Sequence, residues 1–170
     1  FGCELHDASD VFHDTGFNAF RDVLAQGGRV RVIGAPGGAK LSRKDIDELT
    51  LLAQKGGAKG LAWAKLEADG AATGGIAKFL DAPAIAALAA RTGTGPGDAL
   101  FFVADEPVRS ALALGQVRLG LPEKLGLPVA DGLHFCWVHR FALFEPSAES
   151  PTGWAPAHHM FTMPEAQYLE

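Results

Sequence analysis

The sequence predicts a folded domain in which helices and strands alternate, and three observations support this. Hydrophobic residues make up 48% of the 170 residues and charged residues 21%, which suits a buried core and not a disordered chain. The 21 glycines and 10 prolines indicate many turns. Between residues 29 and 66, a strand pattern, a helix pattern and a second strand pattern follow one another, which is a compact α/β unit.

The first part of the chain leads into this unit. Residues 9–12 and 17–24 fit either short helices or an edge strand, and the pattern does not decide between them. Residues 29–33 alternate charged and apolar side chains, which predicts a half-buried strand with Arg29 and Arg31 on the solvent face. Glycines and a proline at 34–38 are expected to end that strand.

The clearest helix is expected to begin at Ser42. Ser42 and Asp45 have the spacing of a capping box, in which each side chain accepts a hydrogen bond from a free backbone amide. Gly56 and Gly57 are expected to end the helix, and residues 61–66 to form the next strand. The apolar positions at helical spacing, which predict the buried face, are Ile46, Leu49, Leu52 and Ala53.

The second half of the chain repeats this rhythm. Residues 81–83 open a helix that would bury Ile85, Leu88 and Ala89, and the apolar run 99–104 predicts a central strand covered on both faces. A further helix is expected from Glu106 to about Leu119, followed by a short helix or loop at 121–128 and an aromatic strand at 134–144. The side chains expected to face inward from the Glu106 helix are Val108, Ala111, Leu112 and Leu119.

The charge of the chain is unevenly distributed. The net charge is −5, but residues 29–65 carry eight Lys and Arg against three acids, a balance of +5. Residues 1–28 carry −4, residues 66–132 carry −3 and residues 133–170 carry −3. The basic segment is either a solvated face or a patch that contacts nucleic-acid phosphates, and the sequence alone leaves both interpretations open.

Several classes of protein and site are not expected. No apolar run approaches the roughly 20 residues of a membrane helix, and the start does not resemble a signal peptide. Two cysteines indicate no disulfide scaffold, which favours a reducing, cytoplasmic setting. The loop 34–42 lacks the second glycine and the hydroxyl of a phosphate-binding loop. No metal site is expected, because the adjacent His158 and His159 would point to opposite sides of an extended segment.

Several short segments together resemble a known family. They are VIGAPGGA at 32–39, SRKDIDE at 42–48, GAKGLA at 57–62, IAKFL at 76–80 and GDALFF at 97–102. In the tail, WVHRFALFE at 137–145 and AHHMFT at 157–162 are similar to the family patterns W-V-x-D-F-P-x-F-E and M-H-H-P-F-T. The chain thus resembles bacterial-type aspartyl-tRNA synthetase over nearly its whole length. The family has an acid and prolines where this chain has Arg140, Ala142 and Met160.

The resemblance implies an organisation and a fold class. Residues 1–25 would be a lead-in from the catalytic domain, residues 26–132 the insertion domain shared with a subunit of a tRNA-dependent amidotransferase, and residues 133–170 part of the class II catalytic domain. The implied fold class is α+β, a two-layer module with helices on one face of a mainly antiparallel sheet, plus a strand and loop remnant of the catalytic domain. Because the chain begins with Phe1 and not Met, we expect a piece of a longer protein.

The resemblance also implies a function. The parent enzyme would use ATP with Mg to activate aspartate and pass the aspartyl group to tRNA, as a cytoplasmic homodimer whose dimer-forming region lies outside this chain. This chain alone would be inactive, with no bound cofactor, no complete set of catalytic residues and no membrane contact. His158, with His159 beside it, would contact aspartate, and Arg43, Lys44 and Lys59 would contact tRNA. The alternative is a stand-alone tRNA-binding or protein-docking module derived from the insertion domain.

Overall fold

The chain divides into two units, Phe1–Val129 and Ala130–Glu170, which are described separately. The computed structural model describes residues 3–128, 131–133, 135–137 and 142–157. The division lies close to the boundary predicted at 132/133. The assignment of residues 133–170 and of 1–25 to a catalytic domain stays a prediction, and in this structure residues 5–7 and 18–25 are structural elements of the first unit.

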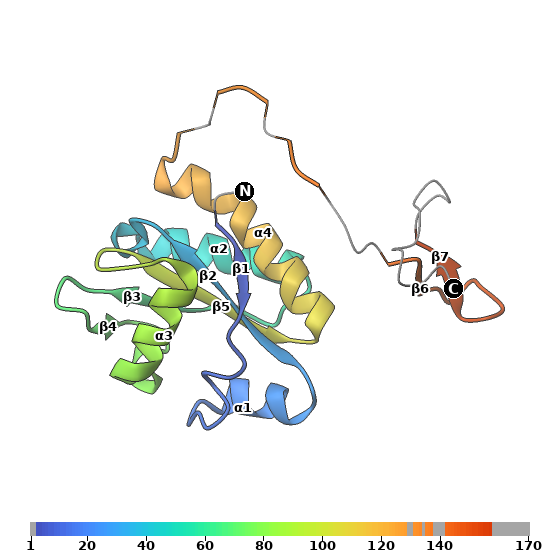
Figure 1. Ribbon diagram of the computed structural model, residues 1–170, viewed down its shortest axis with the longest axis horizontal. Helices are drawn as coiled ribbons and strands as arrows, with labels where there is room; N and C mark the ends of the chain where they lie inside the picture. Colours follow the sequence, from blue (N-terminus) through green and yellow to red (C-terminus); the bar gives the residue numbers. More distant parts are fainter. Residues whose placement is uncertain (1–2, 129–130, 134, 138–141, 158–170) are drawn as a thin grey trace. The chain divides into compact units, whose positions relative to one another are not determined.

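The first unit is built on a sheet whose five described strands have the order β1-β2-β5-β3-β4 (Figure 1). Every adjacent pair is antiparallel. Because β2 and β3 both run antiparallel to β5, they run parallel to each other, with β5 between them. The strands are β1 (Leu5–Asp7), β2 (Arg29–Ala35), β3 (Ala62–Leu66), β4 (Ala72–Thr73) and β5 (Ala99–Asp105).

The prediction of a central strand at 99–104 is confirmed by β5. It is the middle strand of the sheet and all of its residues except Ala104 are buried. Phe101 and Val103 pack in one hydrophobic cluster, whereas Leu100 and Phe102 pack in another. Successive side chains of a strand point to opposite faces, so both faces of this sheet have a core.

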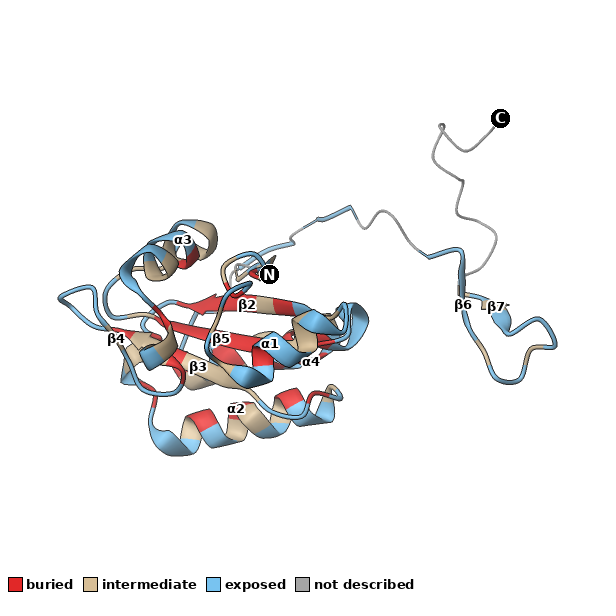
Figure 2. Ribbon diagram, turned by 90° about the horizontal axis from the view of Figure 1, so that it is seen from below, coloured by how far each residue is buried: buried red, intermediate tan, exposed pale blue. Residues whose placement is uncertain are grey.

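Helices cover both of these faces. The α2 (Arg43–Lys55) and α4 (Pro107–Leu125) helices pack on the Phe101 side, and α1 (Asn18–Ala25) and α3 (Ala82–Thr92) pack on the Phe102 side. Figure 2 shows α2 and α3 on opposite sides of the sheet. The α+β class and the mainly antiparallel sheet are confirmed, but the prediction of helices on one face is wrong, because apolar side chains on both faces of β5 must be covered.

The helix predicted from Ser42 is confirmed. The Ser42 hydroxyl accepts a hydrogen bond from the Asp45 amide, and the Asp45 carboxylate accepts one from the Ser42 amide, which completes the capping box. Gly56 ends α2 close to α4, since a Cβ added at Gly56 would lie 2.5 Å from Ala113 Cα. Of the predicted buried face, Ile46, Leu49 and Ala53 are buried and Leu52 is partly buried.

The α4 helix departs from the prediction in length and in orientation. It continues to Leu125 with Pro122 inside it, where an end near Leu119 was expected. Val108, Leu112 and Leu119, which were expected to face inward, are 70%, 59% and 70% exposed. The helix has a second apolar stripe at helical spacing, and this second stripe packs in the core. The buried residues of α4 are Ser110, Ala113, Leu114, Val117, Leu121 and Leu125.

The choice left open for residues 9–12 and 17–24 is resolved differently for each segment. Asn18–Ala25 form a helix, whereas residues 9–12 lie in turns and form neither a helix nor a strand. The edge strand of this region is instead Leu5–Asp7, which pairs with β2 and was not predicted. Phe12 and Phe20 anchor this region in the core, with their ring centroids 4.9 Å apart in an edge-to-face arrangement. Two short 3-10 turns, η1 (Gly38–Lys40) and η2 (Ala77–Phe79), connect the other elements.

The second unit contains a short antiparallel hairpin, β6 (Phe144–Pro146) and β7 (Trp154–Pro156). The aromatic strand predicted at 134–144 is wrong where it can be compared. Residues 135–137 and 142–143 lie in no strand, and only Phe144 belongs to one. Phe135 and Trp137 are 91% and 96% exposed, so no neighbouring strand covers them within the described residues. His134 and residues 138–141 lie outside the described part of the chain.

Candidate nucleic-acid interface

The structure brings together two of the three residues predicted to contact nucleic acid. Arg43 and Lys44 are the first two residues of α2, and both side chains are largely exposed. Lys59 follows the other end of the helix. With a rise of 1.5 Å per residue, the length of α2 separates Lys59 from Arg43 by about 20 Å. The three residues therefore do not form one cluster.

Arg43 and Lys44 each have an acidic neighbour one turn along α2. Arg43 Nε lies 3.1 Å from Asp47 Oδ1, and Lys44 Nζ lies 3.9 Å from Glu48 Oε1. Exposed pairs of this kind contribute at most about 1 kcal/mol to stability. A phosphate group can therefore compete for either cation at little cost in folding free energy.

Further cations surround this end of α2, because α4 runs antiparallel to it. Lys124, in the last turn of α4, bonds to Glu48 and lies 3.9 Å from Asp45 Oδ1. The bond to Glu48 raises the pKa of Lys124. Lys40 Nζ donates to the Leu125 carbonyl at 3.2 Å, and Lys65 Nζ donates to the Leu41 carbonyl at 2.8 Å.

These side chains define the candidate interface, which we call the α2 N-terminal cluster. Its five cations and four carboxylates leave a local charge of +1. The cations are Lys40, Arg43, Lys44, Lys65 and Lys124, and the carboxylates are Asp45, Asp47, Glu48 and Glu123. A weak positive excess of this kind can position a phosphate backbone but carries no means of recognising a base.

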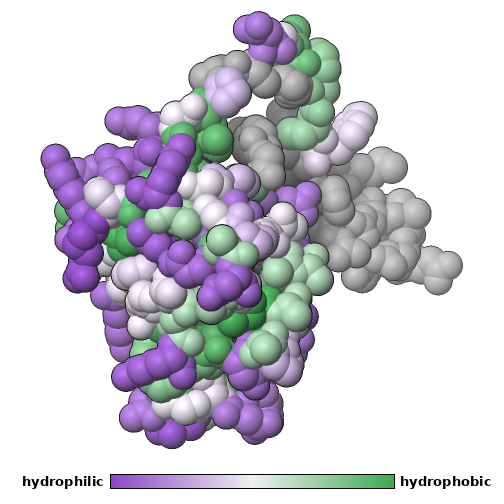
Figure 3. All heavy atoms as spheres, turned by 90° about the vertical axis from the view of Figure 1, so that its left-hand side faces the viewer, coloured by the Kyte–Doolittle hydropathy of each residue, from purple (hydrophilic) through white to green (hydrophobic). Residues whose placement is uncertain are grey.

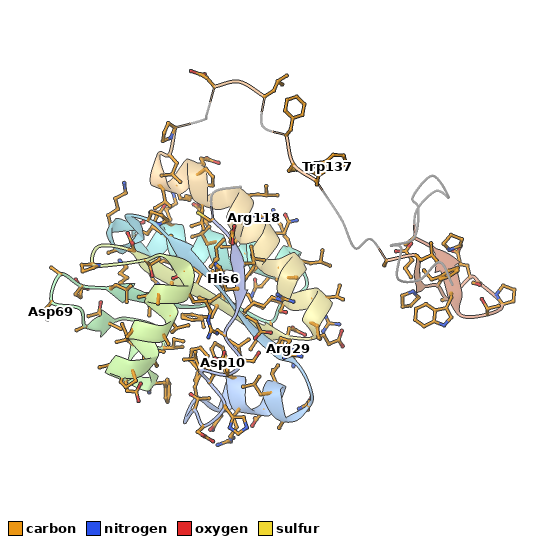
Figure 4. All side chains as sticks on the ribbon, viewed as in Figure 1. His6, Asp10, Arg29, Asp69, Arg118 and Trp137 are labelled. Carbon is orange, nitrogen blue, oxygen red and sulfur yellow. The ribbon has the colours of Figure 1, made fainter. Side chains whose placement is uncertain are left out.

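The rest of the basic segment is less available than its sequence suggests. Arg29, labelled in Figure 4, is the first residue of β2. Its Nη1 atom lies 3.7 Å from Oδ2 of Asp7 in β1, an acid of the negative first segment. Arg31 was predicted to lie on the solvent face, but it is half-buried and its Nε atom has no hydrogen-bond partner among the described residues. On the side of the unit that carries β4 and α3, hydrophilic side chains surround smaller hydrophobic areas (Figure 3).

The glycine-rich loop at 34–38 has a structural role. The Asp98 carboxylate accepts hydrogen bonds from the Gly37 amide at 2.7 Å and from the Gly95 amide at 2.8 Å. The Asp98 carboxylate thus satisfies the backbone amides of Gly37 and Gly95. Gly34 itself lies near the end of β2. A Cβ added there would lie 2.5 Å from Thr94 Cγ2, so this end of β2 packs tightly against the turn that precedes β5. Sequence reasoning missed Asp98, because its partners are distant or belong to a glycine-rich turn.

The residues predicted to contact aspartate, His158 and His159, lie outside the described residues, as do Arg140 and Met160. Ala142 is described and exposed. Within residues 3–128 and the shorter described stretches, no group of three or more His, Cys, Asp or Glu side chains could hold a metal ion. No helix in the described part of the chain is long and apolar enough to cross a membrane.

Comparison with known families identifies the first unit. The GAD domain family matches residues 20–114, which is more than half of the chain. The chain belongs to the GAD domain family. The match runs from α1 into α4, and the first unit of the structure also contains β1 and the second half of α4.

Relatives of the whole chain confirm the resemblance to bacterial-type aspartyl-tRNA synthetase. The aspartate–tRNA(Asp/Asn) ligase of Rubrobacter xylanophilus is 45% identical over 98% of this chain. The aspartate–tRNA ligase of Lysinibacillus sphaericus is 46% identical over 96% of it, and the aspartate–tRNA(Asp/Asn) ligase of Geotalea uraniireducens is 42% identical over 100%. The chain spans 28% of the length of each of these relatives, so the GAD domain and the second unit correspond to one part of them.

Proposed function

We propose that this chain is part of an aspartate–tRNA ligase. The observation that supports the proposal is similarity across both units: eight ligases are 40–46% identical over 96–100% of the chain. In such an enzyme, ATP with Mg activates aspartate to an aspartyl-adenylate, and the aspartyl group then passes to the tRNA 3′ end. The expected setting is a homodimer in the cytoplasm, formed through regions outside this chain.

Two activity assays test the proposal. The complete polypeptide that contains this chain should catalyse aspartate-dependent exchange between ATP and pyrophosphate, and should aspartylate tRNA. The 170-residue chain should do neither, because the resemblance assigns the ATP-binding motifs to regions outside it. Reactions that contain asparagine in place of aspartate are the control. Exchange by the 170-residue chain would overturn its proposed incompleteness, and a complete polypeptide that binds tRNA without charging it would favour the docking-module alternative.

The α2 N-terminal cluster is the part of the GAD domain that we propose to contact tRNA. Replacing both Arg43 and Lys44 with Glu in the complete polypeptide should weaken tRNA binding at low salt. The loss should shrink as salt rises, since each lost phosphate contact lowers the slope of log K against log salt by about 0.9. The same reversal at Arg21 and Lys78, which lie on the opposite layer, is the charge-matched control.

Lys59 is tested separately because it lies at the other end of α2. If tRNA spans the length of the helix, Lys59→Glu should weaken binding independently, and its effect should add to that of the double variant. Unchanged affinity at low salt for the Arg43 and Lys44 double variant would favour the solvated-face interpretation of the basic segment.

The proposed contact between His158 and aspartate rests on the family resemblance. His158→Ala in the complete polypeptide should raise the aspartate concentration needed for exchange more than the ATP concentration. His159→Ala is the neighbouring control. An unaltered aspartate dependence of the His158 variant would reject the assignment while leaving the ligase proposal intact.

A further inference from the structure

Two neighbouring cations of the α2 N-terminal cluster differ in how they meet the acids of their own helix. Arg43 and Lys44 each have a carboxylate four residues further along α2. Arg43 Nε donates a hydrogen bond to Asp47 Oδ1 at 3.1 Å. Lys44 Nζ lies 3.9 Å from Glu48 Oε1, which is too long for a hydrogen bond. The two pairs have the same spacing on adjacent positions, so the difference between them has a cause outside α2.

That cause is a lysine of α4. Lys124 Nζ donates a hydrogen bond to Glu48 Oε2, the other oxygen of the same carboxylate, and lies 3.9 Å from Asp45 Oδ1. The Lys124 side chain is 21% exposed, whereas that of Lys44 is 85% exposed. Attraction between opposite charges is stronger, and less screened by salt, where water is partly excluded. Glu48 therefore pairs with Lys124 in preference to Lys44.

Packing holds Lys124 in this position. It lies in the last turn of α4 between Leu121 and Leu125, which are both buried in the core that α4 shares with α2. One turn earlier, a Cβ added at Gly120 would lie 2.4 Å from Leu52 Cδ1, so the two helices approach closely here. Because its stem is already covered, Lys124 loses less conformational entropy on pairing than the exposed Lys44 would.

The same surroundings make Lys124 a poor contact for a phosphate group. The carboxylates of Asp45 and Glu48 both lie beside its ammonium group. A phosphate that approached Lys124 would be repelled by these two negative charges. Lys44 has the Glu48 carboxylate nearby, but that carboxylate is already bonded to Lys124. Lys44 is thus the lysine of this pair that stays available to an anion.

We infer that Lys124 is a positioning residue for tRNA: it holds the Glu48 carboxylate out of hydrogen-bond distance of Lys44, and so keeps the Lys44 ammonium group available for a phosphate of the tRNA backbone. This inference rests on the proposed contact between the α2 N-terminal cluster and tRNA. It also ranks the two cations of α2. Lys44 should contribute more to binding than Arg43, whose guanidinium group is already hydrogen-bonded to Asp47.

A double-mutant cycle in the complete polypeptide separates this role from a direct contact. The binding of tRNA at low salt is measured for Lys124→Gln, for Lys44→Gln and for the double variant. Each single variant should weaken binding by roughly threefold to tenfold, as expected for one lost phosphate contact. The double variant should bind no more weakly than Lys44→Gln alone, because no Lys44 ammonium group is then left to keep available.

The salt dependence of binding gives a second readout of the same cycle. The slope of log K against log salt should fall by about 0.9 in each single variant, since each loses one phosphate contact. It should also fall by about 0.9, and not by twice that, in the double variant. A loss of stability alone would leave this slope unchanged.

Two control variants accompany the cycle. Arg43→Gln is the matched control, because Arg43 lies beside Lys44 on α2 and carries the same charge but is paired with Asp47 and not with Glu48. Lys124→Gln should keep its full effect in the Arg43→Gln background. Lys124→Arg should bind tRNA like the parent, since a guanidinium group can also pair with Glu48.

Glu48→Gln tests the same inference from the side of the acid. Alone it should leave tRNA binding unchanged, because Lys44 is already available in the parent. Combined with Lys124→Gln it should restore the binding that Lys124→Gln loses, because no Glu48 carboxylate is left to pair with Lys44. A misfolded Lys124→Gln variant would not be rescued in this way. An effect of net charge alone would make Glu48→Gln strengthen binding equally in both backgrounds, and that result would overturn the inference.

The outcomes distinguish this inference from the proposals on which it rests. An equal loss on adding Lys124→Gln to the parent and to Lys44→Gln would overturn it, as would unchanged binding of Lys124→Gln in the parent. In both cases a loss in Lys44→Gln would leave the proposed tRNA contact standing. Unchanged binding of Lys44→Gln would instead reject the contact of Lys44 with tRNA, and this inference with it. Aspartylation of tRNA by the same preparations tests the ligase proposal separately.

Discussion

Two leucines on α4, two positions apart, should respond very differently to truncation. Leu114 of α4 is fully buried against α2 and the sheet, whereas Leu112 is 59% exposed on the other side of the helix. Leu114→Ala should cost about 2–5 kcal/mol, because it removes buried methyl groups and leaves a cavity. Leu112→Ala should cost less than about 0.5 kcal/mol in the 170-residue chain, as expected of an exposed site. A loss of 1 kcal/mol lowers the melting temperature of a domain of this size by about 4 °C. The melting temperature should therefore fall by about 8–20 °C in Leu114→Ala and by less than about 2 °C in Leu112→Ala.

Thermal and urea unfolding of both variants, followed by circular dichroism, measure this difference. The side chain and the replacement are the same in both cases, so the helix propensity of the new residue cancels in the comparison. Similar losses for the two variants would refute the assignment of the core side of α4. A greater loss for Leu112→Ala would restore the orientation expected from the sequence.

Three further predictions concern single contacts of the GAD domain. Gly56→Ala should destabilise the domain by about 1–3 kcal/mol, because the added Cβ would collide with the backbone of α4. Gly60→Ala is the control and should leave the stability unchanged, since a Cβ added there meets no atom within 4 Å. Urea unfolding measures both variants. Ser42→Ala should lower the free energy of unfolding by about 1 kcal/mol, because it removes the N-terminal cap of α2. A urea-unfolding midpoint equal to that of the parent chain would contradict this prediction. Hydrogen bonds from Arg91 lower the pKa of Asp10 to about 2. The contact therefore makes its full contribution to folding stability at pH values above the ordinary pKa of 3.8, and this contribution is lost as the pH falls through 2. Carboxyl NMR titration should show that low pKa for Asp10 (Figure 4), and Arg91→Gln should return it towards 3.8.

Local signals explain which elements the sequence predicts well. The α2 helix has its cap, its buried face and its glycine end within 16 residues, and β5 is a continuous apolar run, so neither depends on distant residues. The orientation of α4 could not be predicted in the same way. Its two apolar stripes have the same period, and only packing against α2 and the sheet selects between them.

Predictions that depended on distant partners were less successful. The alternation of Arg29 and Arg31 with Val30 and Val32 suggested one solvated face, but α4 covers that face where β2 continues to Ile33 and Ala35. The charge of residues 29–65 was summed along the chain, whereas in space Arg29 of this segment lies beside Asp7, an acid of another segment. The sequence identified the residue types of the candidate interface but not their spatial grouping, which is set by the antiparallel packing of α2 and α4.

The position of β5 in the sheet has a consequence for synthesis and folding. Before residue 99 leaves the ribosome, β2 can pair only with β1, and β3 only with β4, among the described strands. Two-stranded ribbons of this size are marginal in water, so neither half of the sheet persists. When β5 emerges it inserts between β2 and β3 and brings both cores together at once. The nascent GAD domain should therefore pass from largely unfolded to native in one cooperative step, late in its own translation, and truncation before β5 should abolish the fold.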